Sequence, residues 1–188
     1  MKNLKSFADK LFPLNEEELN HLYSIFEPIQ LNKKEHLFVE NDSIQHIYFL
    51  SEGIFRCYCV KDGKEFTTAL ITEPMIFAEL LSIRSQSKTL INLQALENVT
   101  CYQANFKAFE QLKNQHINIK RLVFKLYEKI YIKGTQRQVS FIYDSQTERY
   151  NKFVEEKSEY IDKIPGQYIA SYLGIQPETL SRIRRKSM

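Results

Sequence analysis

Residues 166–183 read Gly-Gln-Tyr-Ile-Ala-Ser-Tyr-Leu-Gly-Ile-Gln-Pro-Glu-Thr-Leu-Ser-Arg-Ile, and this pattern predicts two short helices joined by a tight turn. Gly174 can take the left-handed conformation that ends the first helix, and Pro177 suits the first turn of the second, where no backbone N–H is needed. The small Ala170 stands where the two helices would cross. Apolar residues fall at the spacings that fill the core between them, namely Ile169, Leu173, Ile175, Leu180 and Ile183. Such a register is typical of a helix-turn-helix motif.

The second of these helices carries a polar stripe on its outward face. The stripe follows the i, i+3, i+4, i+7 spacing and comprises Glu178, Ser181, Arg182 and Arg185. Arg can donate two hydrogen bonds to guanine, Glu can accept one from cytosine, and Ser can serve either kind of base edge. Thr179, Arg184 and Lys186 complete the candidate DNA-binding set, in which Arg184 and Lys186 would meet phosphates. The alternative is a solvated helix end that binds nothing.

The net charge of +3 is unevenly distributed along the chain. Residues 1–105 carry 10 Lys and Arg against 14 Asp and Glu, a net charge of −4. Residues 106–188 carry 16 against 9, a net charge of +7. A polyanion such as DNA would therefore meet the second part of the chain, although a basic helix can also be no more than a solvated surface.

Apolar residues in the middle of the chain, from Phe106 onward, follow helical periodicity. Phe106, Phe109 and Leu112 form one turn-spaced stripe, and a single helix is expected over Ile119–Ser140, with Gly134 as its only breaker. Its narrow apolar seam comprises Ile119, Leu122, Val123, Leu126 and Ile130. We expect this seam to pack against a second copy of the chain, as in a two-stranded coiled coil. The alternative is that it packs back on the chain's own barrel.

Short alternating segments precede this helix and follow a predicted helix over Glu16–Phe26. The strands are expected at Glu35–Glu40, Ile47–Leu50, Ile54–Val60, Phe66–Ile71, Leu90–Ala95 and Thr100–Ala104. Asp62-Gly63 between two of them is a strong hairpin signal. Short strands at this regular spacing predict a small antiparallel barrel or jelly roll.

The composition is that of a globular chain, with 43% hydrophobic and 26% charged residues among 188, which argues against disorder. No run approaches the roughly 20 apolar residues of a membrane span, and the N-terminus lacks the apolar region of a signal peptide. The three cysteines are an odd number without a Cys-x-x-Cys spacing. A reduced, cytoplasmic setting without a membrane is therefore expected.

With these motifs in this order, the chain resembles the cyclic-AMP receptor / fumarate-nitrate reduction regulator superfamily of bacterial transcription factors over nearly its whole length. The Glu-x-x-Ser-Arg pattern is met by Glu178, Ser181 and Arg182. The front part is similar at 48–53, 62–65 and 77–80. The resemblance implies an α+β chain with a β-roll sensor domain at 1–118, a long dimerisation helix at 119–144 and a helix-turn-helix domain at 145–188. The given sequence ends at Met188, so the family's C-terminal wing is expected to be missing or incomplete.

The resemblance also places a candidate effector pocket at Ala78, Glu79, Leu80, Lys88 and Thr89, but with departures. Members that bind a cyclic nucleotide have Gly where Ala78 stands, and Arg followed by Ser or Thr where Lys88-Thr89 stands. Lys cannot make the two-pronged contact of Arg with a phosphate. Lys133-Gly134-Thr135 stands where members that bind cyclic AMP contact the adenine ring, and it offers only one hydroxyl for that contact. We therefore expect an effector other than cyclic AMP.

Cysteines bear on a second branch of the family. No Cys precedes Cys57, which disfavours the iron–sulfur cluster of the oxygen-sensing members. Cys57 and Cys59 are two apart on a predicted strand, where they are either a thiol sensor or two small core residues.

Two other functions remain as alternatives. One is a β-roll ligand-binding module that acts through protein contacts. The other is a cupin-like metalloenzyme, which would need clustered histidines, whereas the four here are scattered at positions 21, 36, 46 and 116. The favoured hypothesis is a regulator, not an enzyme, without a metal or other cofactor. It would bind palindromic DNA as a homodimer and would contact RNA polymerase if it activates transcription.

Overall fold

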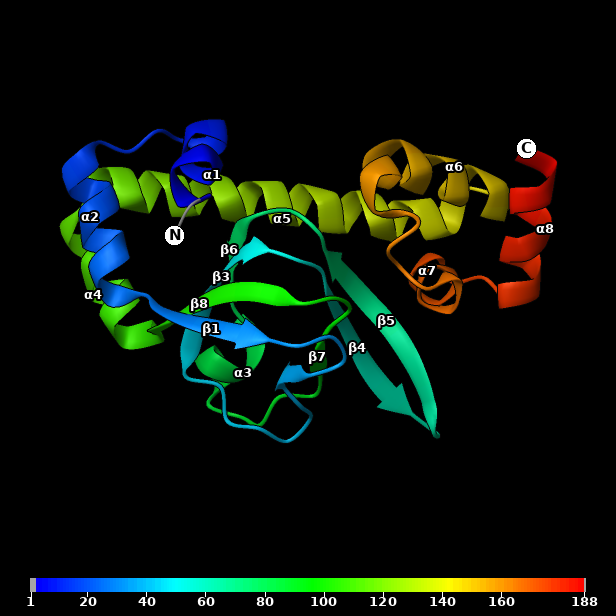
Figure 1. The fold of residues 1–188 in the computed structure, drawn as a ribbon, viewed down its shortest axis with the longest axis horizontal. Helices are drawn as coiled ribbons and strands as arrows, with labels where there is room; N and C mark the ends of the chain where they lie inside the picture. The colour runs from blue at the N-terminus through cyan, green and yellow to red at the C-terminus, as the bar shows by residue number, and fades with distance from the viewer. Residues whose placement is uncertain (1–2, 188) are drawn as a thin grey trace.

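The computed structural model describes residues 3–187, and side chains for residues 3–185. In Figure 1 a β-roll lies along one side of a long helix, α5 (Ile117–Tyr143), whose far end carries the C-terminal helices. The helices α1 (Leu4–Leu11), α2 (Glu16–Ile25) and α4 (Phe106–Gln115) gather at the other end of α5. Within the described residues, no helix combines the length and the apolar composition that a membrane span requires.

Within residues 3–187, eight strands form two antiparallel four-stranded sheets. The first has the order β1 (Glu27–Leu31), β8 (Val99–Asn105), β3 (His46–Glu52) and β6 (Met75–Phe77). The second has the order β2 (His36–Phe38), β7 (Asn92–Ala95), β4 (Phe55–Lys61) and β5 (Lys64–Ile71). One buried cluster draws on both sheets and includes Phe38, Leu50, Phe55, Leu93 and Val99. The α+β architecture expected from the sequence is confirmed.

The β4–β5 hairpin forms at the residues that predicted it. Lys61 pairs with Lys64, so Asp62 and Gly63 make a two-residue turn. Both have positive φ, 51° and 70° respectively, as the tightest hairpin turns require.

Four elements were missing from the sequence-based expectation: α1, β1, β6 and α3 (Leu80–Ser85). Strand β1 contains Pro28, which argues against a central strand, and β1 indeed lies at the edge of its sheet, where a missing N–H is tolerated. Strand β6 is only three residues long. Segments as short as β6 and the six-residue α3 carry too few residues for a periodic pattern to emerge.

The predicted dimer seam on α5 is wrong for most of its residues. Ile119, Leu122, Val123 and Leu126 are buried within the single chain, in a cluster that includes Leu4 and Phe7 of α1. The stripe is apolar as expected, but the chain's own elements cover it. Both α1 and α4 contact α5, and the buried cluster also includes residues of α2 and of the strands. Ile130, the fifth seam residue, is 44% exposed.

The opposite face of α5 is the one left uncovered. Large apolar side chains are exposed there, namely Ile117, Phe124, Tyr131, Ile132, Val139, Ile142 and Tyr143. Five of them, Ile117, Phe124, Tyr131, Val139 and Ile142, fall on one face at helical spacing, and we call this set the outer stripe. Tyr131 and Ile142 are 76% and 78% exposed.

The C-terminal part comprises α6 (Gln146–Lys157), a short 3-10 helix (Ser158–Tyr160), α7 (Gly166–Leu173) and α8 (Pro177–Ser187). Gly174 ends α7 with φ of +64°, and Pro177 begins α8, as the sequence predicts. Every apolar residue expected between the two helices is buried: Ile169, Ala170, Leu173, Ile175, Leu180 and Ile183. The predicted helix pair is therefore confirmed in its position, turn and core.

Candidate functional site

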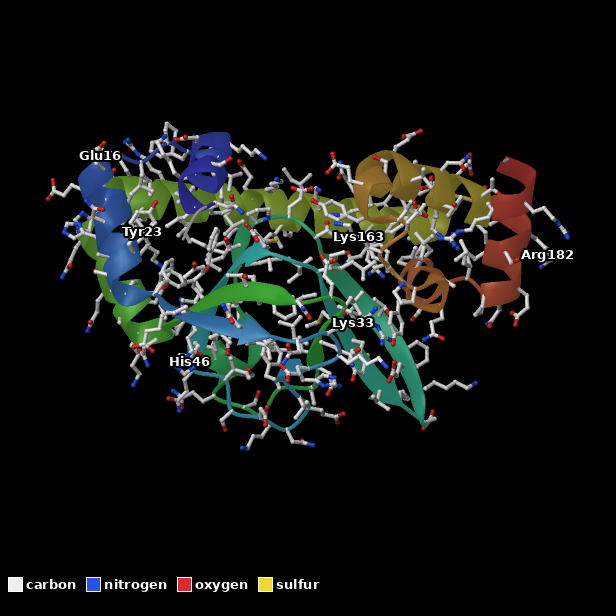
Figure 2. All side chains as sticks on the ribbon, in the orientation of Figure 1. Glu16, Tyr23, Lys33, His46, Lys163 and Arg182 are labelled. Atoms are coloured by element: carbon white, nitrogen blue, oxygen red, sulfur yellow. The ribbon has the colours of Figure 1, made fainter. Side chains whose placement is uncertain are left out.

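The outward face of α8 is exposed along the predicted stripe. Glu178, Ser181, Arg182 and Arg185 are all open to solvent. Figure 2 shows Arg182 pointing away from the molecule at its far end. Its Nη2 donates to Thr179 Oγ1 at 3.0 Å, so half-buried Thr179 orients the guanidinium. Two arginines and a carboxylate thus stand side by side on an accessible helix, as base recognition requires.

Two members of the predicted set differ in placement. Arg184 is half-buried and its guanidinium carbon lies 6.0 Å from the centre of the Tyr150 ring on α6, beside the exposed stripe. The side chain of Lys186 lies outside the described residues. Arg184 therefore borders the stripe from the α6 side, where a DNA backbone would flank a helix in the groove.

Two arginines anchor the helix pair to the rest of the chain. Arg137 of α5 donates to the backbone oxygen of Tyr172 at 2.8 Å, and Arg149 of α6 donates to that of Leu173 at 3.0 Å. These oxygens belong to the last turn of α7, whose carbonyl groups lack helical partners and attract cations. Gly174 packs against Phe141 so closely that a Cβ would lie 2.8 Å from that ring. The orientation of α7 relative to α5 is thereby fixed.

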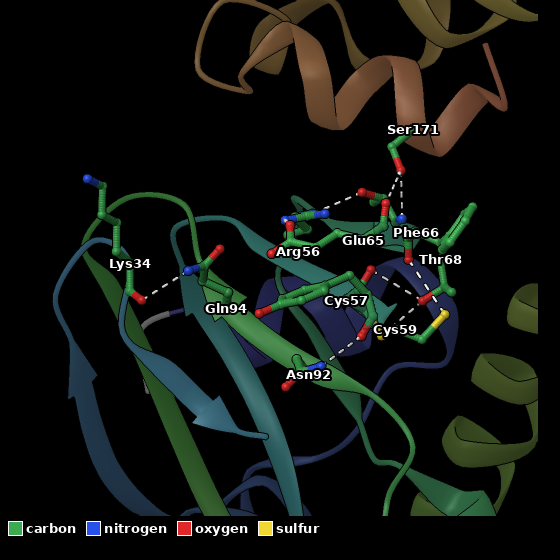
Figure 3. Close-up of polar contacts among 12 residues, drawn as sticks. Lys34, Arg56, Cys57, Cys59, Glu65, Phe66, Thr68, Asn92, Gln94 and Ser171 are labelled. Carbon is green, nitrogen blue, oxygen red and sulfur yellow. Dashed lines mark hydrogen bonds and ion pairs between the residues drawn. The ribbon is translucent and has the colours of Figure 1, made fainter. Parts of the chain in front are cut away.

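A second anchor joins α7 to the β4–β5 hairpin, and we call it the α7 joint. The Thr67 N–H on edge strand β5 donates to Ser171 Oγ at 2.9 Å, as Figure 3 shows. Arg56 of β4 is 1% exposed and its guanidinium lies between the rings of Tyr58 and Tyr168, at 4.3 and 3.7 Å.

Two polar partners complete the coordination of Arg56 in the α7 joint. It donates to Glu65 at 2.6 Å and to Thr67 Oγ1 at 2.9 Å. Sequence analysis missed this joint, since Thr67 and Ser171 are 104 positions apart and the two sides share no motif.

A cavity of about 620 Å³ lies between the β-roll, α1, α5 and the end of α6, and we call it the roll cavity. Its wall includes Phe38, Phe77 and Leu93 from the strands, Ile91 just before β7, and Lys129, Lys133 and Lys157 from the helices. Of the predicted effector-pocket residues, Ala78 and Glu79 line it, but Leu80, Lys88 and Thr89 do not.

The contacts of these residues explain the difference. Glu79 caps α3, because its carboxylate accepts from the N–H groups of Leu81 and Ser82 at 3.1 and 3.0 Å. The Lys88 ammonium donates to Ser43 Oγ at 2.9 Å on the exposed surface. Thr89 is buried and its backbone pairs with Asn41 and Asp42. The predicted pocket is therefore corrected: its five residues do not converge on one site.

The cysteines occupy different environments. Burial raises the pKa of the Cys57 thiol, which accepts a hydrogen bond from Thr68, and raises the pKa of Cys101 to about 12. Cys59 is half-buried. A thiol with a raised pKa is a poor nucleophile, which favours a core role for Cys57. No group of three or more metal-binding side chains occurs in the part of the chain that the structure describes.

Comparison with known proteins agrees with this architecture. Residues 28–116 match the family model of the cyclic nucleotide-binding domain. No curated protein matches the sequence. Among solved structures, the c-di-GMP responsive global regulator CLP of Xanthomonas campestris has a TM-score of 0.73 at 12% identity, covering 92% of this chain and 91% of that one.

Two further solved structures share the fold. FixK2 of Bradyrhizobium japonicum has a TM-score of 0.72 at 17% identity, covering 86% of this chain and 84% of its own. The catabolite activator protein of Thermus thermophilus has a TM-score of 0.57 at 18% identity, covering 92% and 83%. The resemblance drawn from the sequence is thus confirmed at the level of fold: residues 28–116 match the cyclic nucleotide-binding domain family, and the chain has the fold of regulators of the cyclic-AMP receptor / fumarate-nitrate reduction regulator superfamily.

Proposed function

We propose that the chain is a sequence-specific DNA-binding transcriptional regulator that reads DNA with α8. The observation that carries this proposal is the exposed stripe of Glu178, Ser181, Arg182 and Arg185 on the second helix of a tightly anchored pair. The helices α7 and α8 form the helix-turn-helix, and α8 lies in the major groove. The net charge of +7 over residues 106–188 supports contact with a polyanion.

The regulator acts as a homodimer whose interface is the outer stripe of α5. A row of exposed large apolar side chains on a 27-residue helix is costly in water and is suited to a matching helix from a second copy. Two copies paired in this way present two α8 helices to a palindrome with half-sites about 34 Å apart. If the regulator activates transcription, RNA polymerase is a further partner.

The dimer interface has its own test in a pair of variants on α5. Tyr131→Asp places a charge in the outer stripe and should give monomers by light scattering, because two buried carboxylates would oppose each other. Ile130→Asp lies on the side that faces the roll cavity and should leave the dimer intact. The interface is misplaced if Ile130→Asp, and not Tyr131→Asp, yields monomers.

The β-roll is the sensor, and its effector is not cyclic AMP. This part of the proposal is supported by the contacts of Lys88 with Ser43 and of Glu79 with α3, which leave the cavity without the expected phosphate and ribose partners. The named structural neighbours are regulators, which favours regulation over catalysis. No metal or other cofactor is needed for the DNA-binding step.

DNA binding is tested by gel shift against random DNA with a salt titration. A specific binder should retain a subset of sequences at salt concentrations that remove the rest, and the retained subset should be palindromic. Loss of all sequences at the same salt concentration would contradict sequence-specific reading. Absence of binding at low salt would instead favour a β-roll module that acts through protein contacts.

A further inference from the structure

The roll cavity has a size and a lining suited to a small ligand. Its volume of about 620 Å³ falls within the range of small-molecule sites, roughly 300–1,000 Å³. We propose that it binds an organic anion with an apolar body, whose single carboxylate or phosphate head meets Lys129, Lys133 and Lys157. The effector role of this ligand rests on the proposed function, whereas its binding does not.

The wall formed by the β-roll calls for an apolar ligand body. Strands from both sheets contribute side chains without hydrogen-bonding groups to this wall, including Phe38, Phe77, Leu93 and Ala69, and Ile91 joins them from the segment before β7. A nucleobase or a sugar placed against them would leave several donors and acceptors unsatisfied, which costs free energy for each group. A hydrocarbon chain or an unsubstituted aromatic ring has no hydrogen-bonding groups to leave unsatisfied there, and its transfer out of water is favourable.

The helical wall supplies positive charge. Lys129 and Lys133 are four residues apart on α5, so they lie on one face of the helix. Neither makes a hydrogen bond or ion pair with another described residue, whereas Lys125 on the same helix pairs with Glu128. Both are therefore available to an incoming anion.

Lys157 closes the group from α6. Its ammonium donates to Thr72 Oγ1 at 2.6 Å and lies 4.0 Å from Glu73. Burial lowers the pKa of Lys157, and Lys133 and Lys129 lower it further, while Glu73 and Glu156 act in the opposite direction. The ammonium groups of the exposed Lys129 and Lys133 and of the half-buried Lys157 repel one another, and an anion between them relieves that repulsion.

The position of Lys157 connects the ligand to the DNA-binding part. Lys157 is the last residue of α6, and α6 packs against both α7 and α8. Its partner Thr72 directly follows β5 of the roll. An anionic head that draws the Lys157 ammonium away from Thr72 changes the contact between the roll and α6. A ligand can shift a conformational equilibrium only if it makes different contacts in the two states, and this change would supply that difference.

The decisive experiment is calorimetric titration of the full-length protein with matched twelve-carbon probes below their micelle thresholds. Dodecanoate and dodecyl phosphate carry the two candidate heads, while dodecanol and dodecyltrimethylammonium share the body but lack an anion. One anionic probe per chain should bind at least about tenfold more tightly than dodecanol, because charge-assisted hydrogen bonds add to the apolar contact. The preferred head tells a carboxylate from a phosphate ligand.

Variants locate the site. The double variant Lys129→Met/Lys133→Met should bind dodecanoate about as weakly as dodecanol, since it keeps the apolar wall and removes two charges. Lys120→Met, on an exposed part of α5 outside the cavity, should bind like the parent. Equal affinity for dodecanol and dodecanoate, tighter binding of cyclic AMP, or an unaffected double variant would each overturn the proposal.

Measuring DNA affinity on the same samples separates the two proposals. Ligand binding without any DNA binding would leave the cavity assignment standing and overturn the regulator. Specific DNA binding without ligand binding would leave the regulator standing and overturn the cavity assignment. If both hold, saturating dodecanoate should change the affinity for the selected palindrome, and no change would show that this anion is not the effector.

Discussion

Two polar contacts between the β-roll and the C-terminal helices are built differently. They lie beside a shared apolar cluster to which the roll contributes Ile54, Leu70 and Leu96. In the α7 joint, Arg56 is held by two rings, a carboxylate and a hydroxyl, and an edge-strand N–H is bonded by Ser171. At the other contact, Lys157 makes one hydrogen bond to Thr72 and lies near like charges. The polar groups of the α7 joint are paired with one another, whereas an incoming anion can replace Thr72 as the partner of the Lys157 ammonium. We therefore regard the α7 joint as a fixed hinge point, called the pivot below, and the Lys157 contact as one that can open, called the arm.

Breaking the pivot should have the largest effect. Arg56→Met keeps an unbranched aliphatic side chain but removes two charge-assisted hydrogen bonds and the stacking with both tyrosines. We expect the free energy of unfolding to fall by about 3 kcal/mol, measured by urea denaturation.

A matched control for Arg56→Met is Arg84→Met, which removes an exposed arginine paired with Glu110 at 2.8 Å. It should cost no more than about 0.5 kcal/mol. Equal losses in the two variants would show that the α7 joint is an ordinary surface contact.

Removing one hydrogen bond should loosen the pivot by a smaller amount. Ser171→Ala leaves the Thr67 N–H on edge strand β5 without its acceptor. We expect a loss of about 1 kcal/mol, seen as roughly fivefold faster hydrogen exchange at the Thr67 amide. Ser24→Ala, which removes an exposed hydroxyl bonded within α2, should leave that amide unchanged. Unchanged exchange in Ser171→Ala would mean that the bond does not protect the edge of the sheet.

Removing the arm should change stability least. In Lys157→Met the lost bond to Thr72 is offset by the removal of a poorly solvated charge, so the free energy of unfolding at pH 7 should change by no more than about 0.5 kcal/mol.

The same variant tests the sign of the pH dependence. The folded state lowers the pKa of Lys157 below its ordinary 10.5, so the unfolded chain holds this proton more strongly. Wild type should therefore gain stability relative to Lys157→Met as the pH rises from the folded pKa toward 10.5. A relative loss over that range would contradict the burial of this ammonium.

The sequence allowed the local features to be predicted. Gly174, Pro177 and Asp62-Gly63 act through backbone conformation within a few residues, and each lies where expected. Which face of α5 is buried depends instead on elements distant in sequence, including α1 at the start of the chain. The stripe of Leu4, Phe7, Ala8 and Leu11 at i, i+3, i+4, i+7 was a usable signal for that helix.

The candidate site was predictable to a similar extent. The reading face of α8 follows from helical periodicity alone. The roll cavity and the α7 joint were missed, since both arise where residues distant in sequence meet in three dimensions. Lys88 and Thr89 were assigned to the effector pocket by analogy with a family motif. In the structure Lys88 donates to Ser43 and the backbone of Thr89 pairs with Asn41 and Asp42, so neither residue lines the roll cavity.

The central claim is that α8 reads bases, and the most direct measurement is the base preference of sites selected from random DNA by wild type and by Arg182→Ala. The variant should lose its preference at one guanine in each half-site, at a cost of about 1–3 kcal/mol per contact, and keep the other positions. Arg84→Ala, in α3, should select the same sites as wild type. Identical base preferences of Arg182→Ala and wild type at every position would contradict the claim.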